Sequence, residues 1–176
     1  MEQIARESGI SRMTLHRRGV TRATVFSALT ARLEDDYRRA MWPALTASGS
    51  GRERLARALA AECDVAEQNL ELLGALEEGE RNAIFHDSGG PRLTRSTFTE
   101  PLVRLLRDGA ADGSLRECDP QETATVLFNL IGFTYRHLRV GHGWDAERAR
   151  GGVLEIALRG VVAEAIGKER PRETIA

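Results

Sequence analysis

The chain has 176 residues, of which 41% are hydrophobic and 29% are charged, and its 25 basic residues nearly balance 26 acidic ones. This length suffices for one domain with a sizeable core, or for a small head on a larger body, but not for two full-sized domains. The composition excludes wholesale disorder and collagen-like structure. Because the net charge is −1, any contact with nucleic acid must come from a local concentration of charge.

The first residues carry the pattern of a helix-turn-helix. Two short helices are expected on either side of the segment Ser8-Gly9-Ile10-Ser11, and the second one carries residues 13–18. Gly9 permits a tight left-handed turn, Ser11 can cap the second helix, and Ala5 is small enough for the two helices to cross closely.

Positive charge is concentrated in this same segment. Residues 1–32 contain six arginines and two glutamates, which is about four positive charges net, as a local DNA-binding surface requires.

Helical spacing continues through the rest of the chain, and no alternating strand pattern bounded by turns is present, so the predicted fold class is all-α. After a flexible loop at residues 48–51, one long helix is expected, with an apolar face formed by Leu55, Leu59, Cys63, Ala66, Leu70 and Leu73. Between residues 92 and 113 the helical stripe contains Pro101, which predicts a kink or a new helix start there.

Two further helices are expected near the carboxyl end. Asp119, Pro120 and Glu122 form a helix start, and the helix is predicted to run to about Val140, before the glycines at 141 and 143. A last helix is expected from near Asp145 to about residue 167. The charged segment from Lys168 has no apolar periodicity and is expected to be a frayed tail.

The last helix has two apolar stripes side by side. One contains Val153, Ile156, Ala157 and Gly160, and the other contains Leu154, Leu158, Val161 and Ala165. Such a wide arc favours two packing partners, the body of the chain and a second copy of it. The alternative is a helix that is simply central to its own core.

The sequence also bears on cellular location. The two cysteines, Cys63 and Cys118, lie far apart with no metal-binding or disulfide pattern. No apolar stretch is long enough to cross a bilayer, and the amino terminus lacks the hydrophobic region of a signal peptide. The chain is therefore predicted to be cytoplasmic.

The head resembles the tetracycline-repressor (TetR) family. Residues 4–17, IARESGISRMTLHR, are similar to the family pattern IA-x-x-AGVS-x-x-TLY-x-HF, and Thr21-Arg22-Ala23 stands where the family has Ser-Lys-Glu. Residues 113–116 with Asp119-Pro120 are similar to a loop and helix start in its C-terminal domain. The chain departs from the pattern at His16, at Gly19 and at Ala23, which replace tyrosine, phenylalanine and glutamate.

The resemblance implies two domains. Residues 1–42 are predicted to form the helix-turn-helix DNA-binding domain, and residues 43–176 a helical domain for effector binding and dimerisation. Family members carry one more helix before the Ile4-Ala5 pair, so we expect that the chain start is truncated and that the head lacks its first helix.

The resemblance and helix-turn-helix geometry together assign the DNA contacts. The second helix is expected in the major groove, with Arg12, Met13 and Thr14 at base edges. Phosphate contacts are expected from the side chains around it and from the helix start that follows. The predicted DNA-binding residues are Ser11, Arg12, Met13, Thr14, His16, Arg17, Arg18, Thr21 and Arg22.

By the same resemblance, the body binds a small effector and dimerises through its last two helices. The candidate pocket residues are the aromatics Trp42, Phe85, Phe98, Phe128 and Phe133, whose alternative role is plain core packing. The candidate dimer interface comprises Phe128, Tyr135, Val153, Ile156, Ala157, Gly160 and Val161. The predicted function is a ligand-responsive repressor that binds palindromic double-stranded DNA as a homodimer and is released by its effector.

Two other functions compete with this prediction. An enzyme is disfavoured because the chain contains no Glu-x-x-His pair, nucleophile elbow, phosphate-binding loop or zinc-protease motif. His137 and His142 are poorly spaced for a metal, and no cofactor is expected. The second alternative is a truncated family member that serves as a dimeric small-molecule-binding or protein-interaction module without stable DNA binding.

Overall fold

A computed structural model describes residues 2–76, 78–86 and 94–162. Its helices are α1 (Glu2–Ser8), α2 (Arg12–Arg17), α3 (Arg22–Thr46), α4 (Gly51–Gln68), α5 (Leu70–Ala75), α6 (Glu78–Phe85), α7 (Ser96–Ala111), α8 (Pro120–Arg136), a π-helical turn η1 (His137–Gly141) and α9 (Ala146–Arg159). Within the described residues, β pairing is limited to two isolated bridges, one of them between Leu115 and Val162.

The helix starts follow from local capping. Ser50 accepts a hydrogen bond from the Glu53 backbone N–H, and the Glu53 carboxylate accepts one from the Ser50 N–H, at the start of α4. Asp119 caps α8 directly before Pro120, and Asp145 caps α9. Each cap satisfies backbone donors that have no partner within the helix, so these starts lie where the sequence predicts them.

The body is a bundle built around α4 and α8. Helix α4 packs against α3, α7, α8 and α9, while α8 also packs against α7 and α9. The core is aliphatic and aromatic and includes Tyr37, Leu59, Phe98, Ile131 and Tyr135, each no more than 2% exposed.

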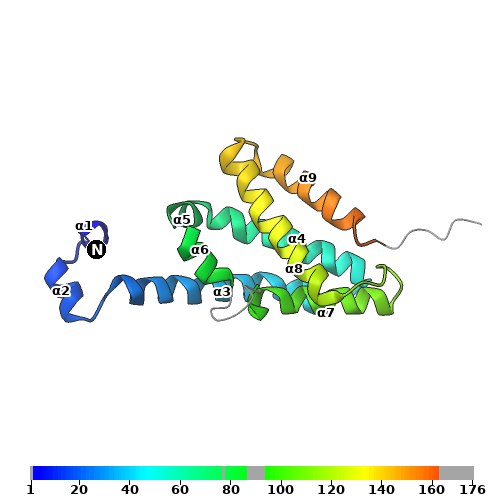
Figure 1. Ribbon diagram of the computed structural model, residues 1–176, viewed down its shortest axis with the longest axis horizontal. Coiled ribbons are helices and arrows are strands. Elements are labelled where there is room, and N and C mark those ends of the chain that lie inside the picture. Colours follow the sequence, from blue (N-terminus) through cyan, green and yellow to red (C-terminus); the bar gives the residue numbers. More distant parts are fainter. Residues whose placement is uncertain (1, 77, 87–93, 163–176) are drawn as a thin grey trace, which may run out of the picture.

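The head lies apart from this bundle. Helix α3 runs from the body to the head, so that α1 and α2 lie at its far end (Figure 1). Because α3 is continuous through residues 42 and 43, the predicted domain boundary falls inside a helix.

The helices differ from the expected ones at one point, and at Pro101 one of the two expected outcomes is absent. The long helix expected through Leu73 ends at Gln68, and α5 begins after Asn69, which is buried and donates its side-chain amide to the Val65 carbonyl at 2.8 Å. Helix α7 runs through Pro101 without a new start. Pro101 lies in the second turn, where the missing amide deprives only the Thr97 carbonyl of its partner.

The structure describes only part of the stretch in which the last helix was predicted to end. The described part of α9 ends at Arg159, while the rest of the stretch expected to reach residue 167, and the tail expected from Lys168, lie outside the described residues.

Candidate functional site

The turn between α1 and α2 has the geometry of a helix-turn-helix. Gly9 has a φ of +65°, a conformation that side chains disfavour, and the Ile10 backbone N–H donates to the Ala5 carbonyl at 3.1 Å. Ser11 then caps α2, because its hydroxyl accepts from the Thr14 N–H at 3.1 Å. These hydrogen bonds, all between residues 5 and 14, therefore fix the angle between the two helices.

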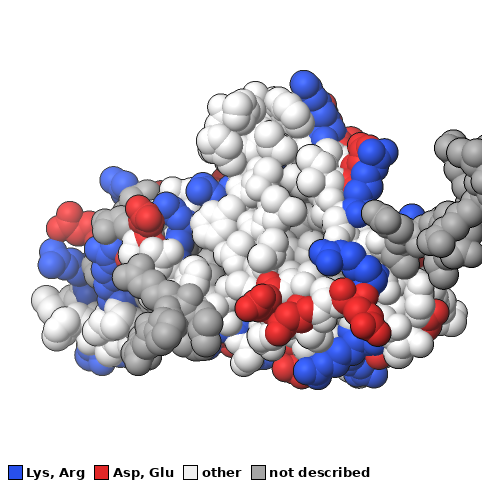
Figure 2. All heavy atoms as spheres, turned by 45° about the vertical axis from the view of Figure 1, so that its right-hand side comes forward, with Lys and Arg blue, Asp and Glu red and all other residues white. Residues whose placement is uncertain are grey.

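Helix α2 presents most of its predicted DNA contacts to the outside. Arg12, Met13, His16 and Arg17 are exposed, Met13 to 80%. Leu15 is the buried member of the helix. Basic side chains gather at this end of the molecule (Figure 2).

A second turn joins α2 to α3. Gly19 has a φ of +69°, and Thr21 and Thr24 form a reciprocal capping box at the start of α3. The first backbone N–H groups of α3 therefore lie beside exposed Thr21 and Arg22, an arrangement that favours an anion.

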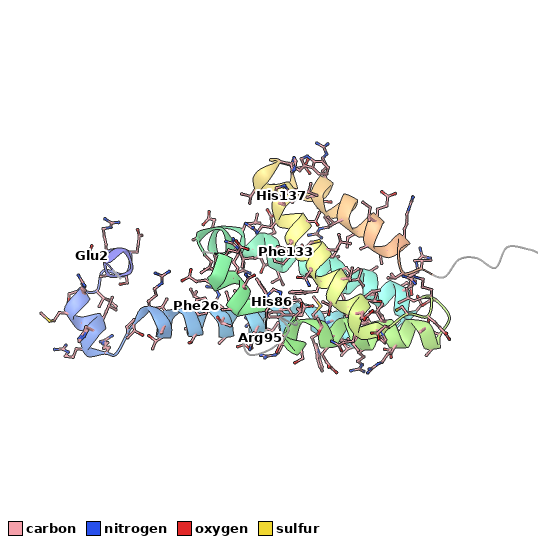
Figure 3. The ribbon with its side chains drawn as sticks, in the orientation of Figure 1. Glu2, Phe26, His86, Arg95, Phe133 and His137 are labelled. Carbon is pink, nitrogen blue, oxygen red and sulfur yellow. The ribbon has the colours of Figure 1, made fainter. Side chains whose placement is uncertain are left out.

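Two of the predicted DNA-binding arginines lie against carboxylates in this conformation. Arg12 pairs with Glu2 at 3.0 Å on the exposed surface of the head, where Figure 3 labels Glu2. Arg22 donates to Glu80 Oε1 on α6, from Nε at 3.2 Å and from Nη2 at 2.6 Å. The second pair links the start of α3 to the body, and the sequence gives no sign of it because 58 residues separate its members.

The body contains a cavity of about 70 Å³. A single water needs about 10–15 Å³, so the cavity has room for a small ligand. The residues that line it are Leu33, Tyr37, Glu62, Val65, Ala66, Asn69, Leu73, Arg81, Phe85, Phe98, Phe128, Gly132, Phe133 and Arg136.

Four of the five predicted pocket aromatics line this cavity. Phe98 and Phe128 stack with ring centroids 5.2 Å apart, and Phe85 lies 5.3 Å from Phe98. Phe133 on α8, labelled in Figure 3, is 44% exposed and so lies at the rim.

Trp42 was wrongly assigned to the pocket, since it is 65% exposed and does not line the cavity. The buried row of α3 is Leu33, Tyr37, Met41 and Ala44. Trp42 follows Met41 by one residue and so points about 100° away from that row. Tyr37, which the prediction missed, could have been found from the spacing of this row.

The sequence analysis also missed the polar groups of the cavity. Glu62 is 3% exposed, and neither of its carboxylate oxygens has a hydrogen-bond partner among the described residues. Burial raises the pKa of Glu62 well above its ordinary value, and the nearby Gly132 backbone amide offsets part of that rise. The signal that could have found Glu62 is a charged residue on the same helix face as Leu55, Leu59 and Ala66.

Most residues predicted for the dimer interface lie inside the protomer. Phe128 lines the cavity, and Tyr135 is fully buried, with its hydroxyl donating to Glu67 Oε2 at 2.8 Å. The remaining three that are buried are Val153, Ala157 and Val161, each 3–4% exposed. Phe128, Tyr135 and Val153 therefore face the core of their own protomer, whereas Ala157 and Val161, although buried, also line the groove between α8 and α9. The interface itself stays a prediction.

Ile156 and Gly160 of the predicted interface are exposed, Ile156 to 69%. They line a shallow groove between α8 and α9 together with Val126, which is 63% exposed, and Leu130. Figure 2 shows a broad uncharged band on one face of the body, with charged side chains beside it.

Solved structures provide the comparison for this arrangement, since no protein-family model and no curated protein matches the chain. A transcriptional regulator of the TetR/AcrR family from Thermobifida fusca YX-ER1 is similar with a TM-score of 0.64 and 21% identity, over 89% of this chain and 84% of that one. The chain has a TetR-like fold. A protein of unknown function from Rhodococcus sp. RHA1 is similar with a TM-score of 0.58 and 22% identity, over 92% and 84% of the two chains.

The TetR-like fold confirms the all-α prediction and the arrangement of head, long helix and bundle. No helix of the described residues is long and apolar enough to span a membrane. In the same part of the chain, no group of three or more histidine, cysteine or acidic side chains is placed to hold a metal ion.

Proposed function

We propose that the chain is a transcriptional regulator that binds palindromic DNA as a homodimer and is released by a small-molecule effector. The observation that carries this proposal is α2, a capped helix whose exposed side bears arginines and which lies at the far end of α3, clear of the body. Such a helix can enter a major groove without a clash from the rest of the protein.

The exposure of α2 supports particular roles in DNA contact. Arg12, Met13 and Thr14 lie in its first turn, the end that meets base edges in helix-turn-helix proteins. His16, Arg17 and Arg18 follow in its last turn and in the turn after it, within reach of phosphates. The capped start of α3 at Thr21 supplies a second phosphate site.

Helix α6 supports a route for the effector. Its Arg81 and Phe85 line the cavity, and its Glu80 binds Arg22 at the start of α3. A ligand can bind more tightly to the chain when α6 is in a different position. Such a ligand changes how often the Arg22–Glu80 contact is formed, and so changes the affinity for DNA.

The groove between α8 and α9 supports the homodimer. Val126 and Ile156 are large apolar side chains exposed on neighbouring helices, and a second copy would cover both at once in a two-fold interface. A dimer would place two copies of α2 on successive major grooves, about 34–36 Å apart.

The test is selection of binding sites from random double-stranded DNA by the full chain, followed by fluorescence anisotropy across a salt series. We expect palindromic sites with half-sites one helical turn apart. The double variant Arg17→Ala, Arg18→Ala should weaken binding, and the slope of log K against log salt should become shallower by about four units per dimer, since each protomer loses two phosphate contacts.

A matched control removes two exposed arginines of α7, with Arg104→Ala and Arg107→Ala, and should bind as the wild type does. If no sequence is enriched at low salt, the proposal is wrong. A small-molecule-binding module without stable DNA binding would then be the better description.

A further inference from the structure

The cavity wall contains a carboxyl group without a partner. Glu62 lies on the buried face of α4 and is 3% exposed, and neither Oε1 nor Oε2 forms a hydrogen bond within the described residues. The pocket surface around it is aliphatic and aromatic, with Leu33, Val65 and Phe128 among its members.

Two of the polar groups that share the cavity, those of Tyr37 and Arg81, are engaged elsewhere. The Tyr37 hydroxyl donates to the Phe98 carbonyl at 2.7 Å. The Arg81 guanidinium donates to the carbonyls of Leu73 and Leu76. No ion pair joins Glu62 to Arg81, to Arg136 or to any other cation of the described chain.

A carboxyl group in this setting is costly to the folded state. Proteins pair nearly all buried polar side chains, because an unpaired one loses its bonds to water and gains none in return. The sequence places a glutamate here although the neighbouring members of its helix face, Leu59 and Ala66, are apolar. The described residues leave Glu62 without a hydrogen-bond partner, so a molecule that occupies the cavity can supply one.

The remaining wall restricts the shape of that occupant. Phe85, Phe98 and Phe128 form a cluster with centroid separations of 5.2 to 5.8 Å. Aromatic walls pack against flat apolar groups, and their faces attract cations. Both properties fit a molecule with an apolar ring at one end and a positive charge at the other.

We propose that the cavity binds an aromatic or aliphatic amine, with the ammonium group paired to the Glu62 carboxylate and the apolar body against Phe85, Phe98 and Phe128. This inference rests on the proposed function for the identification of the cavity as an effector site. It adds the chemical class of the effector and the residue that selects it.

The experiment is isothermal titration calorimetry of the full chain with three probes of similar size: phenethylamine, 2-phenylethanol and 3-phenylpropanoate. We expect phenethylamine to bind about tenfold more tightly than the alcohol, because a charge-assisted hydrogen bond is roughly twice as strong as a neutral one. The carboxylate probe should bind most weakly, because it brings no hydrogen-bond donor for Glu62 and a second acidic group must be buried beside it.

Substitution at Glu62 identifies the selecting group. Glu62→Gln keeps the shape of the side chain and should abolish the preference for the amine. Glu62→Asp keeps the charge and should retain part of it. Glu71→Gln, an exposed carboxylate on α5, is the matched control and should bind all three probes as the wild type does.

The inference is overturned if none of the probes binds, or if the amine and the alcohol bind equally. It is also overturned if the carboxylate probe is preferred because Arg81 or Arg136 selects it. A preference for the amine that persists in Glu62→Gln would overturn it as well. The outcome is separate from that of the DNA experiment. If the amine binds through Glu62 but the chain binds no DNA, the proposed regulator function is wrong and this inference stands. If the chain binds DNA but does not bind the amine, only this inference is wrong.

Discussion

At the scale of single residues, Glu62 is the most unusual feature of the chain. Tyr37 shares the cavity with it and Cys63 follows it on α4, and burial raises the pKa of both, that of Cys63 to about 12. Arg81 and Arg136 line the same cavity. Glu62 is therefore the group whose titration dominates this region between acidic and neutral pH.

Glu62 predicts a dependence of stability on pH. Burial raises its pKa in the folded chain above the ordinary value of 4.5, so the folded state holds a proton that the unfolded state has released. The free energy of unfolding should then fall as pH rises above 4.5, by up to about 1.4 kcal/mol per pH unit, until the raised pKa is passed. Urea unfolding of Glu62→Gln and the wild type across this range measures the effect.

The difference in unfolding free energy between Glu62→Gln and the wild type should grow with pH in favour of the variant. The variant Glu71→Gln, which removes an exposed carboxylate, should follow the wild-type curve. Parallel curves for Glu62→Gln and the wild type would show that Glu62 is not the group responsible.

At the scale of elements, the close crossing of α4 and α7 fixes the bundle. A Cβ on Gly51 would lie 2.2 Å from the Gly109 Cα, and backbone atoms cannot yield as a flexible side chain can. The Asp112 carboxylate also accepts from the Gly51 N–H at 2.6 Å. The first turn of α4 is thus held directly against the last turn of α7.

Gly51→Ala should therefore destabilise the fold by about 1–3 kcal/mol, since the two helices must move apart. Gly74→Ala on α5 provides the comparison, because a Cβ there meets nothing within 4 Å, and it should stabilise by up to about 1 kcal/mol. Thermal unfolding followed by circular dichroism measures both. Equal effects of the two substitutions would contradict the close crossing.

The contact between α3 and α6 predicts a change in DNA affinity. Glu80 competes with DNA phosphates for Arg22, so Glu80→Gln should strengthen binding and Arg22→Gln should weaken it. Fluorescence anisotropy with the selected site measures both. Glu78→Gln, an exposed carboxylate in the first turn of the same helix, is the control. Weaker binding by Glu80→Gln would mean that the contact supports the DNA-binding conformation.

At the scale of the whole molecule, the groove between α8 and α9 predicts a dimer that surface charges can break. Val126→Asp together with Ile156→Asp replaces two apolar side chains, each more than 60% exposed, with carboxylates. The variant should be monomeric at micromolar concentration by multi-angle light scattering, with little loss of thermal stability, because neither side chain belongs to the protomer core.

Val140→Asp is the matched control for the dimer, since Val140 is 60% exposed and lies on η1 outside the groove. It should leave the mass unchanged. A wild-type chain that is already monomeric under these conditions would refute the dimer itself.

Much of the fold could be predicted because helix starts depend on neighbours in sequence. Ser11, Ser50, Asp119 and Asp145 each cap a helix through a backbone N–H no more than three residues ahead. Gly9 makes its turn through its own backbone conformation. Such interactions require nothing from the rest of the chain, so the head and most helix boundaries follow from local pattern.

The candidate site could be predicted only in part, because helical spacing does not say which face is covered. The resemblance offered the aromatics as pocket candidates, and Phe85, Phe98, Phe128 and Phe133 line the cavity, but nothing in the sequence separated them from Trp42, which does not. It also could not show that Glu62 is buried, since nothing next to it in the sequence covers it.

The sequence by itself determined the all-α class, the helix-turn-helix and the basic head, because each depends on residues within one or two helical turns. The tertiary structure alone decided that Val153 and Ala157 of α9 face inwards while Ile156 faces outwards, that Arg22 meets Glu80, and that Glu62 lies in an apolar cavity. Burial and ion pairing depend on helices brought together from distant parts of the chain, and their energies are settled only when those helices pack.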